Sequence, residues 1–340
     1  MKRIIYPNLG VKRKEILVGP AEGLDTCVIR LDKNKVLVAS TDPLSLIPQL
    51  GIEQSAWMSV NLLVNDLVTS GLEPKYLMVD LNLPPDLPNE TLADYWRTLS
   101  KECKRLGISI VGGNTARFEG CGLTIVGSGT TFTTGSRKQV IVSSGAKVAD
   151  HVIITKGAAI STTGLLSKMF ANKIKSELGK NVQKNAESYF EMISSMKEAL
   201  IASSLGAPDG SVSAMHDVAE GGVLASISEL ASASSLGVKV TKSKIPVSME
   251  TKLVCNLFGI DPLWSLGEGA MTICCNPQVS EELVKKLMQA GIEAAVVGEM
   301  IENERGMILV DARDRTQKLV RPPTDPYWNA YYSAVAKKWE

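Results

Sequence analysis

Hydrophobic residues in the first third of the chain recur with the period of strands and then with the period of a helix. Short β-rich runs cover Thr26 to Leu31 and Lys35 to Ser40. The next apolar residues, from Ala56 to Val68, are spaced for one face of a helix. The pattern therefore predicts two strands followed by a helix.

The alternation continues to about residue 132. The predicted elements are a strand at 75–83, a helix at 89–106, and strands at 108–111 and 122–132. Pro84-Pro85 ends the first of these strands, Asn89 can cap the helix, and Gly107 stops it. These elements complete a first α/β unit.

A second series of strands and helices begins near residue 150. The turn at Gly135-Ser136-Arg137 and the polar stretch at 143–145 indicate a boundary there, so we expect domains at 1–150 and 151–340. The predicted elements are strand 151–155, helices 158–171 and 184–205, strand 211–215, helix 219–236, strand 269–275, helix 279–290, and strands 293–299 and 307–310. This order is typical of α/β or α+β proteins, and 340 residues exceed what one core usually supports.

The charge balance excludes several classes of partner. With 37 basic and 36 acidic residues, the chain lacks the net field that attracts nucleic acid or anionic lipid. Apolar residues make up 44%, but no run reaches the roughly 18 that span a membrane. The Met1-Lys2-Arg3 start is not followed by an apolar signal segment. We expect a cytoplasmic protein that binds neither nucleic acid nor membrane.

The cysteines do not predict a metal site. The chain has no C-x-x-C pair, only two histidines, and six cysteines, Cys27, Cys103, Cys121, Cys255, Cys274 and Cys275. Most of them stand in apolar runs, where cysteine is usually a small buried hydrophobe. We therefore expect reduced thiols in the core.

Acidic residues embedded in apolar runs are the first candidates for chemistry. Asp25, Asp42 and Asp66 each interrupt or end such a run, and a carboxylate at the rim of a core is costly unless a cation or hydrogen-bond donors meet it. Singly, each has a structural explanation, since Asp25 and Asp42 could cap turns and Asp66 could pair with a lysine. Together they fit Mg²⁺, which prefers oxygen ligands and nucleotide phosphates. Neither a P-loop motif nor a G-x-G-x-x-G motif after a strand is present.

Glycine pairs mark two further candidate positions. Gly112-Gly113-Asn114-Thr115 follows the predicted strand 108–111. Gly221-Gly222 precedes an apolar periodic helix, and helix N-termini favour anions. His216, just before this pair, could move protons or hold phosphate, although a histidine beside an aspartate is more often a structural hydrogen-bonding pair.

These segments resemble, in order and spacing, the motifs of the superfamily that contains aminoimidazole ribonucleotide (AIR) synthase and the HypE-type hydrogenase-maturation dehydratase. Gly23 to Ile29 resembles its Gly-Asp-Asp-Ala-Ala-Val-Ile motif, Ser40-Thr41-Asp42 its Thr-Thr-Asp, Val64 to Leu67 its Asn-Asp-Leu-Ala, Gly112 to Thr115 its Gly-Gly-Asp/Glu-Thr, and Ala214 to Val223 its second-domain Gly-Gly motif. Within the superfamily, Ile260 to Gly269 and Asp150 to Gly164 are most similar to the hydrogenase-maturation branch.

The resemblance implies a two-domain AIR synthase-like fold. The N-terminal sheets of two chains would join into an intersubunit β-barrel in a homodimer, with ATP beside the interface, and the C-terminal domain would be α/β. The implied activity is Mg-ATP-dependent phosphorylation of an oxygen or amide of a small or partner-bound substrate. The implied metal ligands are Asp25, Asp42, Asp66 and Asn114; the implied nucleotide-binding residues are Asp25, Thr41, Asn65, Gly112, Gly113, Asn114, Thr115, Glu220, Gly221 and Gly222; and the implied catalytic residues are Asp42, Asp66, His216 and Asp217.

Two departures from the motifs leave alternatives open. Leu24 and Asn114 replace acidic positions of the family pattern, and an amide oxygen brings no charge to a metal. A thiamine-monophosphate kinase type of enzyme shares the architecture but keeps a more acidic first motif. A nucleotide-binding assembly or regulatory protein without turnover is the second alternative.

The tail bears on the choice within the superfamily. The dehydratase carries its reacting group on a C-terminal cysteine, whereas the last cysteine here is Cys275. Ala330, Val335 and aromatic residues recur after Pro326 at roughly helical spacing, which predicts a docked amphipathic helix. We therefore expect a relative of the dehydratase that acts on a separate substrate.

Overall fold

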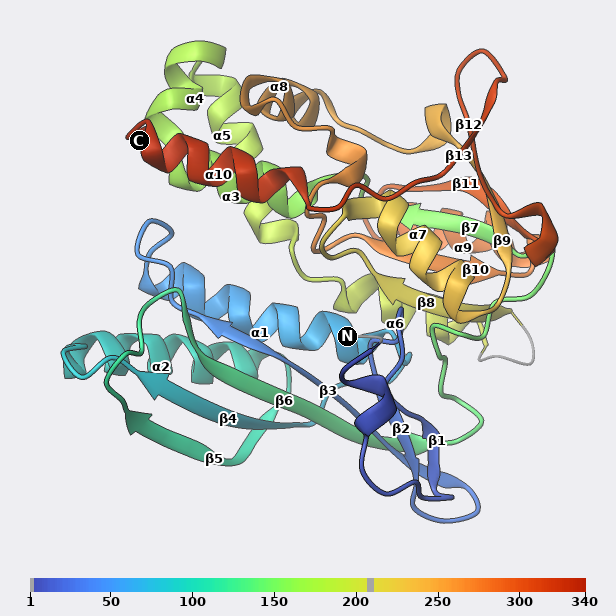
Figure 1. Cartoon of the computed structure of the whole chain (residues 1–340), viewed down its shortest axis with the longest axis horizontal. Coiled ribbons are helices and arrows are strands. Elements are labelled where there is room, and N and C mark those ends of the chain that lie inside the picture. The colour runs from blue at the N-terminus through green and yellow to red at the C-terminus, as the bar shows by residue number, and fades with distance from the viewer. Residues whose placement is uncertain (1–2, 207–210) are drawn as a thin grey trace.

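Two sheets, each packed against helices, organise the chain. The computed structural model describes residues 3–206 and 211–340, so the Met1-Lys2 start considered above lies outside the described residues. The first sheet lies in the N-terminal half and the second in the C-terminal half (Figure 1). The predicted boundary at 150 falls in the connection between the last strand of the first sheet and the first strand of the second. This mixed α/β architecture confirms the predicted fold class.

The first sheet is mostly antiparallel and, within residues 3–206 and 211–340, has helices on one face only. Its strand order is β1-β2-β3-β6-β4-β5, and β4 pairs with β5 in parallel. The strands are β1 (Ile16–Val18), β2 (Cys27–Arg30), β3 (Lys35–Ser45), β4 (Tyr76–Leu83), β5 (Ser109–Arg117) and β6 (Ile125–Ser136). Helices α1 (Ile52–Val68) and α2 (Asn89–Arg105) lie along one side of it (Figure 1).

Alternation along β4 distinguishes the two faces of this sheet. Leu77 and Val79 are buried on the face that α1 and α2 cover. Tyr76 and Met78 point the other way and are 37% and 46% exposed. The face with Tyr76 and Met78 is therefore partly apolar, and no helix of the described chain lies over it.

The second sheet is covered on both faces. Its order is β13-β12-β9-β11-β7-β10-β8. The strands are β7 (His151–Thr155), β8 (Val212–Asp217), β9 (Gly237–Thr241), β10 (Met271–Cys275), β11 (Ala294–Ile301), β12 (Met307–Val310) and β13 (Thr316–Lys318). On β7, Val152 and Ile154 join the core formed with α7 (Gly222–Ala233), whereas Ile153 joins the core that includes residues of α6 (Met196–Ser204) and α9 (Pro277–Gln289). The latter core also contains residues of α1 and α2, so it connects the two halves.

A group of helices lies beside the second sheet and includes the C-terminal segment. Its members are α3 (Ile160–Met169), α4 (Ala171–Leu178), α5 (Lys180–Glu187), α8 (Met249–Phe258) and α10 (Pro326–Ala336). They share one hydrophobic cluster. Within it Tyr331 lies 6.0 Å from Phe170, and Trp339 lies 5.3 Å from Phe258, between ring centroids. The predicted amphipathic tail helix is therefore confirmed.

Several predicted elements need correction. The predicted helix at 184–205 is broken into α5, a 3-10 helix (Ser188–Met192) and α6. It breaks because Asn65 and Lys156 bind the backbone carbonyls of residues 192–194, which takes them out of any helical ladder. Strand β5 continues to Arg117, so Gly112 to Thr115 lie within a strand and not after it. The prediction also lacked β1, β9, β13, α4 and α8.

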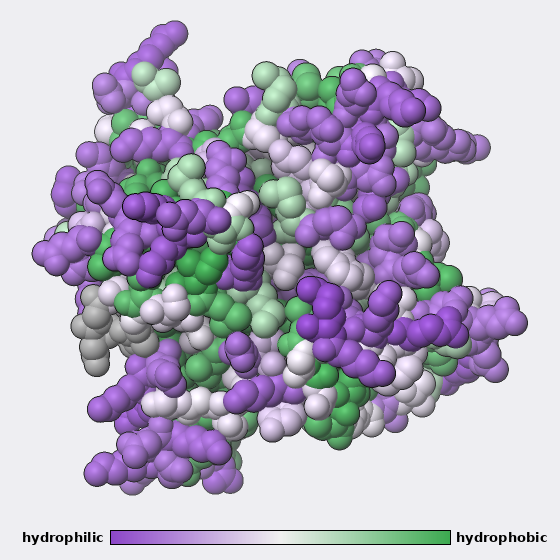
Figure 2. Space-filling model, turned by 180° about the vertical axis from the view of Figure 1, so that it is seen from behind, coloured by the Kyte–Doolittle hydropathy of each residue, from purple (hydrophilic) through white to green (hydrophobic). Residues whose placement is uncertain are grey.

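Surface and thiol chemistry largely follow the prediction. No helix of the described residues is long and apolar enough to cross a membrane. Polar side chains dominate the face of the molecule shown in Figure 2, with small apolar patches between them. All six cysteines are free, and Cys27 and Cys121 are only half-buried, in contrast to the expected core position.

Candidate active site

Five carboxylates and one imidazole converge where the first sheet and α1 meet β8 and β10. They are Asp25 before β2, Asp42 in β3, Asp66 in α1, His216 and Asp217 at the end of β8, and Glu268 before β10. The two-residue period of β3 places Asp42 on the side of the buried Ser40 and Leu44, which faces α1. Asp66 comes from that helix, and the fold thus brings together acids separated by about 250 residues of chain.

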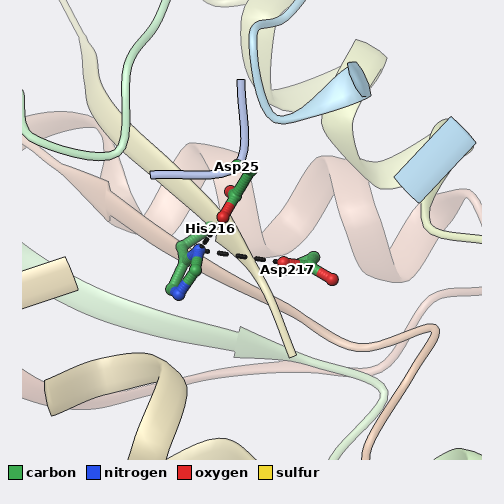
Figure 3. Close-up of side chains that lie close together, drawn as sticks. All are labelled: Asp25, His216 and Asp217. Atoms are coloured by element: carbon green, nitrogen blue, oxygen red, sulfur yellow. Dashed lines mark ion pairs between the residues drawn. The ribbon is translucent and has the colours of Figure 1, made fainter. Parts of the chain in front are cut away.

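His216 is held between carboxylates. Its Nδ1 lies 2.5 Å from Asp25 Oδ1 and 3.7 Å from Asp217 Oδ1 (Figure 3). Its Nε2 lies 3.3 Å from Oε2 of Glu229, a residue of α7. The short contact with Asp25 is an ion-pair distance and not a well-aligned hydrogen bond. Burial lowers the pKa of His216, but the surrounding carboxylates, Asp25 first, outweigh burial and hold the pKa well above its usual range.

The carboxylates themselves are destabilised as anions. Burial raises the pKa of Asp42 to about 6. Burial, and then the charge of Asp25, raises the pKa of Asp217 to about 7. Burial together with the neighbouring carboxylates raises the pKa values of Asp66 and Glu268 well above their usual range. A cluster in which four acids resist ionisation would be stabilised by additional positive charge.

The donor set fits a hard divalent cation. Among the described residues, no lysine or arginine forms an ion pair with Asp42, Asp66, Asp217 or Glu268. One ligand atom each of Asp25, His216 and Asp217 lies within 4.8 Å of the others, which is close enough to share one ion. The rest of the set is carboxylate oxygen, the ligand type that Mg²⁺ prefers. The carboxylate oxygens present therefore suit Mg²⁺, whereas the high pKa of His216 favours the protonated ring, which cannot be a ligand.

Asn65 lies beside this cluster and fixes the loop that passes it. Its Nδ2 donates to the Ile193 carbonyl, and its Oδ1 accepts from the Ser195 amide, both at 2.8 Å. Its Nδ2 also lies 3.5 Å from Oε2 of Glu268. Lys156 binds the carbonyls of Met192, Ser194 and Gly269 and pairs with the buried Glu198 at 2.7 Å. Asn65 therefore positions Glu268 and its surroundings.

The glycine pair before α7 meets an anion from the protein itself. The Gly221 amide donates to Oδ2 of Asp325 at 2.7 Å, at the positively polarised N-terminus of α7. Gly222 has a φ of +65°, and a Cβ there would lie 2.6 Å from the Ser265 carbonyl oxygen. The N-terminus of this helix thus binds an anion, as predicted, and the anion is the Asp325 carboxylate of the C-terminal segment.

The remaining predicted residues lie elsewhere on the first sheet. Thr41 faces the uncovered side, where its hydroxyl donates to the Gly129 carbonyl. Across the sheet, Asn114 of β5 lies opposite Asp80 of β4, and Asp80 lies opposite Ser128 of β6. Ser128 in turn lies opposite Pro43 of β3. Because two strands separate β5 from β3, Asn114 lies roughly 14 Å from the row of Asp42. One chain therefore does not bring Asn114 to the carboxylate cluster.

Gly113 has a structural reason to be glycine. A Cβ at this position would lie 1.8 Å from the Val79 carbonyl oxygen, and its φ is +150°. Asn114 donates to Asp80 at 3.2 Å, so the exposed row beside the glycines contains an acid that the motif search did not include. Gly112 and Thr115 lie on the same strand edge.

Glu268, Glu229 and Arg321 were also missing from the sequence-based site. Arg321 pairs with Glu229 and donates to the Glu220 carbonyl at 2.9 Å. The available signal for Glu268 was an acid between two glycines, directly before the apolar strand β10. Glu229 lies within the periodic helix 219–236 and gave no such signal, because a single acid on a helix is ordinarily solvated.

A cavity of about 510 Å³ opens beside the cluster. Asp42, Glu268 and Glu220 line its polar part. Apolar side chains of α1 and α3 and aromatic side chains of α10 line the rest, among them Met58, Leu62 and Leu165. A cavity of this size accommodates a small organic molecule with one polar end at the carboxylates.

Comparisons with known proteins agree with this architecture. Family models described as AIR synthase related protein match residues 23–133 (N-terminal domain) and 147–311 (C-terminal domain). Carbamoyl dehydratase HypE of Escherichia coli (strain K12) is 26% identical over 267 residues, which are 77% of this chain and 74% of that protein. Thiamine-monophosphate kinase of Aquifex aeolicus is 24% identical over 268 residues, 74% of this chain and 78% of that protein.

Solved structures show the same fold. The crystal structure of E. coli HypE superposes with a TM-score of 0.71 at 23% identity and covers 85% of this chain and 87% of its own. The HypE maturation protein in complex with ATP superposes with a TM-score of 0.66 at 19% identity, over 88% and 89% of the two chains. Both domains of the chain therefore have counterparts in one known architecture.

Proposed function

The chain belongs to the AIR synthase related protein family, and on this premise we propose that it transfers a phosphoryl group from Mg-ATP to an oxygen or amide oxygen of a small or partner-bound substrate. The observation that carries the proposal is the buried carboxylate cluster of Asp25, Asp42, Asp66, Asp217 and Glu268, which no described lysine or arginine neutralises. Related proteins support it, since a HypE structure was determined with ATP and a thiamine-monophosphate kinase structure with AMPPCP.

The cluster would act by positioning and electrostatics. When bound, Mg²⁺ would supply the positive charge that stabilises the charge developing on the phosphate oxygens. Asp42 and Asp66 would hold the ion from the N-terminal half, and Asp217 and Glu268 would hold it from the C-terminal half. Because the proposed ligands come from both halves, ion binding would require the two halves to be packed against each other.

His216 is the candidate group for proton movement. Asp25 and Glu229 hold its ring between them, and both favour the imidazolium form. A buried imidazolium beside phosphate can stabilise negative charge or donate a proton to a leaving oxygen. In the structural interpretation, His216 links Asp25 to α7 through the same contacts.

We propose that the enzyme is a homodimer formed through the uncovered face of the first sheet. That face presents Tyr76, Met78 and Phe132, and the Tyr76 and Phe132 rings lie 5.3 Å apart. Exposed contiguous apolar area of this kind is typical of an interface. A second copy on this face would place its own residues near Asp80 and Asn114.

Substitution of the two best ligands tests the proposal. Asp42→Asn and Asp66→Asn should each lower Mg²⁺-dependent AMPPCP affinity at least tenfold, measured by calorimetry, and abolish ATP turnover without unfolding the chain. The matched control is Asp94→Asn, a surface acid of α2 that pairs with Arg97. If both cluster variants bind nucleotide and turn over ATP like the control, the metal site is assigned wrongly.

A nucleotide-binding protein without turnover is the second candidate, and the neutral residues Leu24 and Asn114 favour it. The two candidates share the metal cluster but differ in hydrolysis. Tight binding of Mg-ATP with no product across a panel of phosphate acceptors would support the regulatory protein.

A further inference from the structure

The C-terminal segment from Arg321 to Ala336 lies beyond the part of the chain that the family models match. It nevertheless reaches the candidate active site. Arg321 pairs with Glu229, Asp325 accepts from the Gly221 amide at 2.7 Å, and the Trp328 indole N–H donates to Oε1 of Glu220 at 2.8 Å. These contacts attach the start of α10 to the segment that carries His216 and Asp217.

The attachment gives α10 one aromatic side that faces the cavity. Tyr327, Trp328, Tyr331 and Tyr332 all contribute to its wall. Trp328 and Tyr332 stack with centroids 6.3 Å apart and planes at 28°, and they remain 38% and 63% exposed. Because its N–H is bound to Glu220, the orientation of the partly exposed Trp328 ring is fixed.

The rest of the cavity lining includes apolar side chains and acids. Met58 and Leu62 of α1 and Leu165 of α3 contribute apolar surface, and Asp42 and Glu268 belong both to the cavity lining and to the carboxylate cluster. A molecule seated here would rest its body on apolar and aromatic surface and present a polar atom to the metal cluster. The predicted nucleotide-binding residues Thr41 and Gly112 to Thr115 lie away from this cavity, on the uncovered face and outer edge of the first sheet.

We propose that α10 forms the acceptor-binding wall of the active site, and that Trp328 and Tyr332 select an acceptor whose reactive oxygen or amide group is attached to a planar aromatic or heteroaromatic ring. This inference rests on the proposed function, because it takes the carboxylate cluster as the place where phosphate is transferred. Aromatic rings stack on one another with a gain beyond simple burial, so a ring acceptor would be preferred over a saturated one of equal size.

Fragment binding to the full chain, with Mg²⁺ and AMPPCP present, tests the proposal. Benzamide and cyclohexanecarboxamide share the amide oxygen and differ in ring planarity. Benzamide should bind roughly two- to tenfold more tightly in an NMR titration. It should shift the indole N–H resonance of Trp328, assigned with Trp328→Phe, and leave that of Trp96 in place. Trp96 is the matched internal control, because it also lies on a helix and is also 38% exposed.

Variants decide which residues cause the preference. Trp328→Ala should abolish the benzamide preference, Trp328→Phe should retain it, and Trp96→Ala should change nothing. Tyr332→Ala serves as a second variant, because a side chain that is 63% exposed can be removed without loss of folding. AMPPCP affinity should change less than twofold in all four variants.

Three results would overturn the proposal: equal binding of the two fragments, an unshifted Trp328 resonance, or a Trp328→Ala variant that loses AMPPCP affinity instead of ring preference. The last result would assign the aromatic wall to the nucleotide base. If wild-type protein binds no AMPPCP, the proposed function fails separately, and the same fragment titration without nucleotide still tests the aromatic wall.

Discussion

Because the clustered carboxylates are destabilised as anions, removing one of them should increase the free energy of unfolding of the metal-free protein. Burial raises the pKa of Asp42 from 3.8 to about 6, so the folded state disfavours the anion above pH 6. The shift corresponds to at most ~3 kcal/mol, and solvent screening at this partly exposed side chain reduces it to ~1–2 kcal/mol. Asp42→Asn should therefore raise the free energy of unfolding by about that amount at pH 8 and low ionic strength.

The sign of the effect depends on pH and on Mg²⁺. The cost of the Asp42 anion is present above its folded pKa of about 6 and disappears as the pH falls towards 3.8, so the gain from Asp42→Asn should fade by pH 4.5. In excess Mg²⁺ the wild type gains stability by mass action and the variant does not. The order of the two melting temperatures should then invert, from a variant that melts roughly 2–6 °C higher without Mg²⁺ to one that melts lower with it.

Thermal denaturation followed by circular dichroism measures this inversion, with EDTA and with Mg²⁺ at pH 8 and at pH 4.5. The control is Asp32→Asn, because backbone donors of Asn34 and Lys35 lower the pKa of that exposed acid and no gain is expected there. A variant at Asp42 that is less stable than wild type in EDTA at pH 8 would refute the reasoning, since it would mean that the anion is stabilised by groups of the protein.

Three further predictions concern the ion, the dimer and the loop. Mg²⁺ affinity measured by calorimetry should fall steadily from pH 8 to pH 6, because burial raises the pKa of Asp217 to about 7 and protons then compete with the ion; a flat profile would contradict this. Met78→Lys on the uncovered sheet face should convert a dimer into a monomer in sedimentation, while Lys101→Glu on α2 should not. Asn65→Ala leaves the Ile193 carbonyl and Ser195 amide unpaired and should cost ~1–3 kcal/mol in urea unfolding, whereas a loss below 0.5 kcal/mol would show that water replaces the amide.

Hydrophobic periodicity predicted those helices and strands whose local sequence pattern matches their burial in the fold. Strand β7 has the bounds expected from its apolar run, and α2 starts at Asn89 as expected, but Asn89 is its first residue and does not cap it, because Pro88 occupies the cap position. Helix α8 had readable signals that were not used, since Ser248 caps it through the Thr251 amide and Gly259 ends it at positive φ. The predicted helix at 184–205 had helical composition throughout, but its break depends on Asn65 and Lys156, which are distant in sequence.

The sequence predicted individual acids of the site but not which acids the fold brings together. Asp25, Asp42 and Asp66 could be recognised because each stands among apolar residues, where an unpaired carboxylate is costly. That Glu268 and Asp217 join them follows from the packing of β8 and β10 against α1, which no local pattern encodes. The same packing separates Asn114 from them, although the motifs had grouped it with the metal ligands.

This separation gives the two departures from the family pattern different consequences. Leu24 precedes Asp25 in the chain, and the carboxylates of Asp25, Asp217 and Glu229 still lie next to His216. Asn114 lies on β5, which two strands separate from β3, and it contacts the carboxylate of Asp80 in the same exposed row at 3.2 Å. A carboxylate at position 114 would repel Asp80 unless a second cation lay between them, whereas the amide donates to it. With an amide at position 114, the outer edge of the sheet needs no ion, and the inner cluster, with its four destabilised acids, is the site that we propose for Mg²⁺.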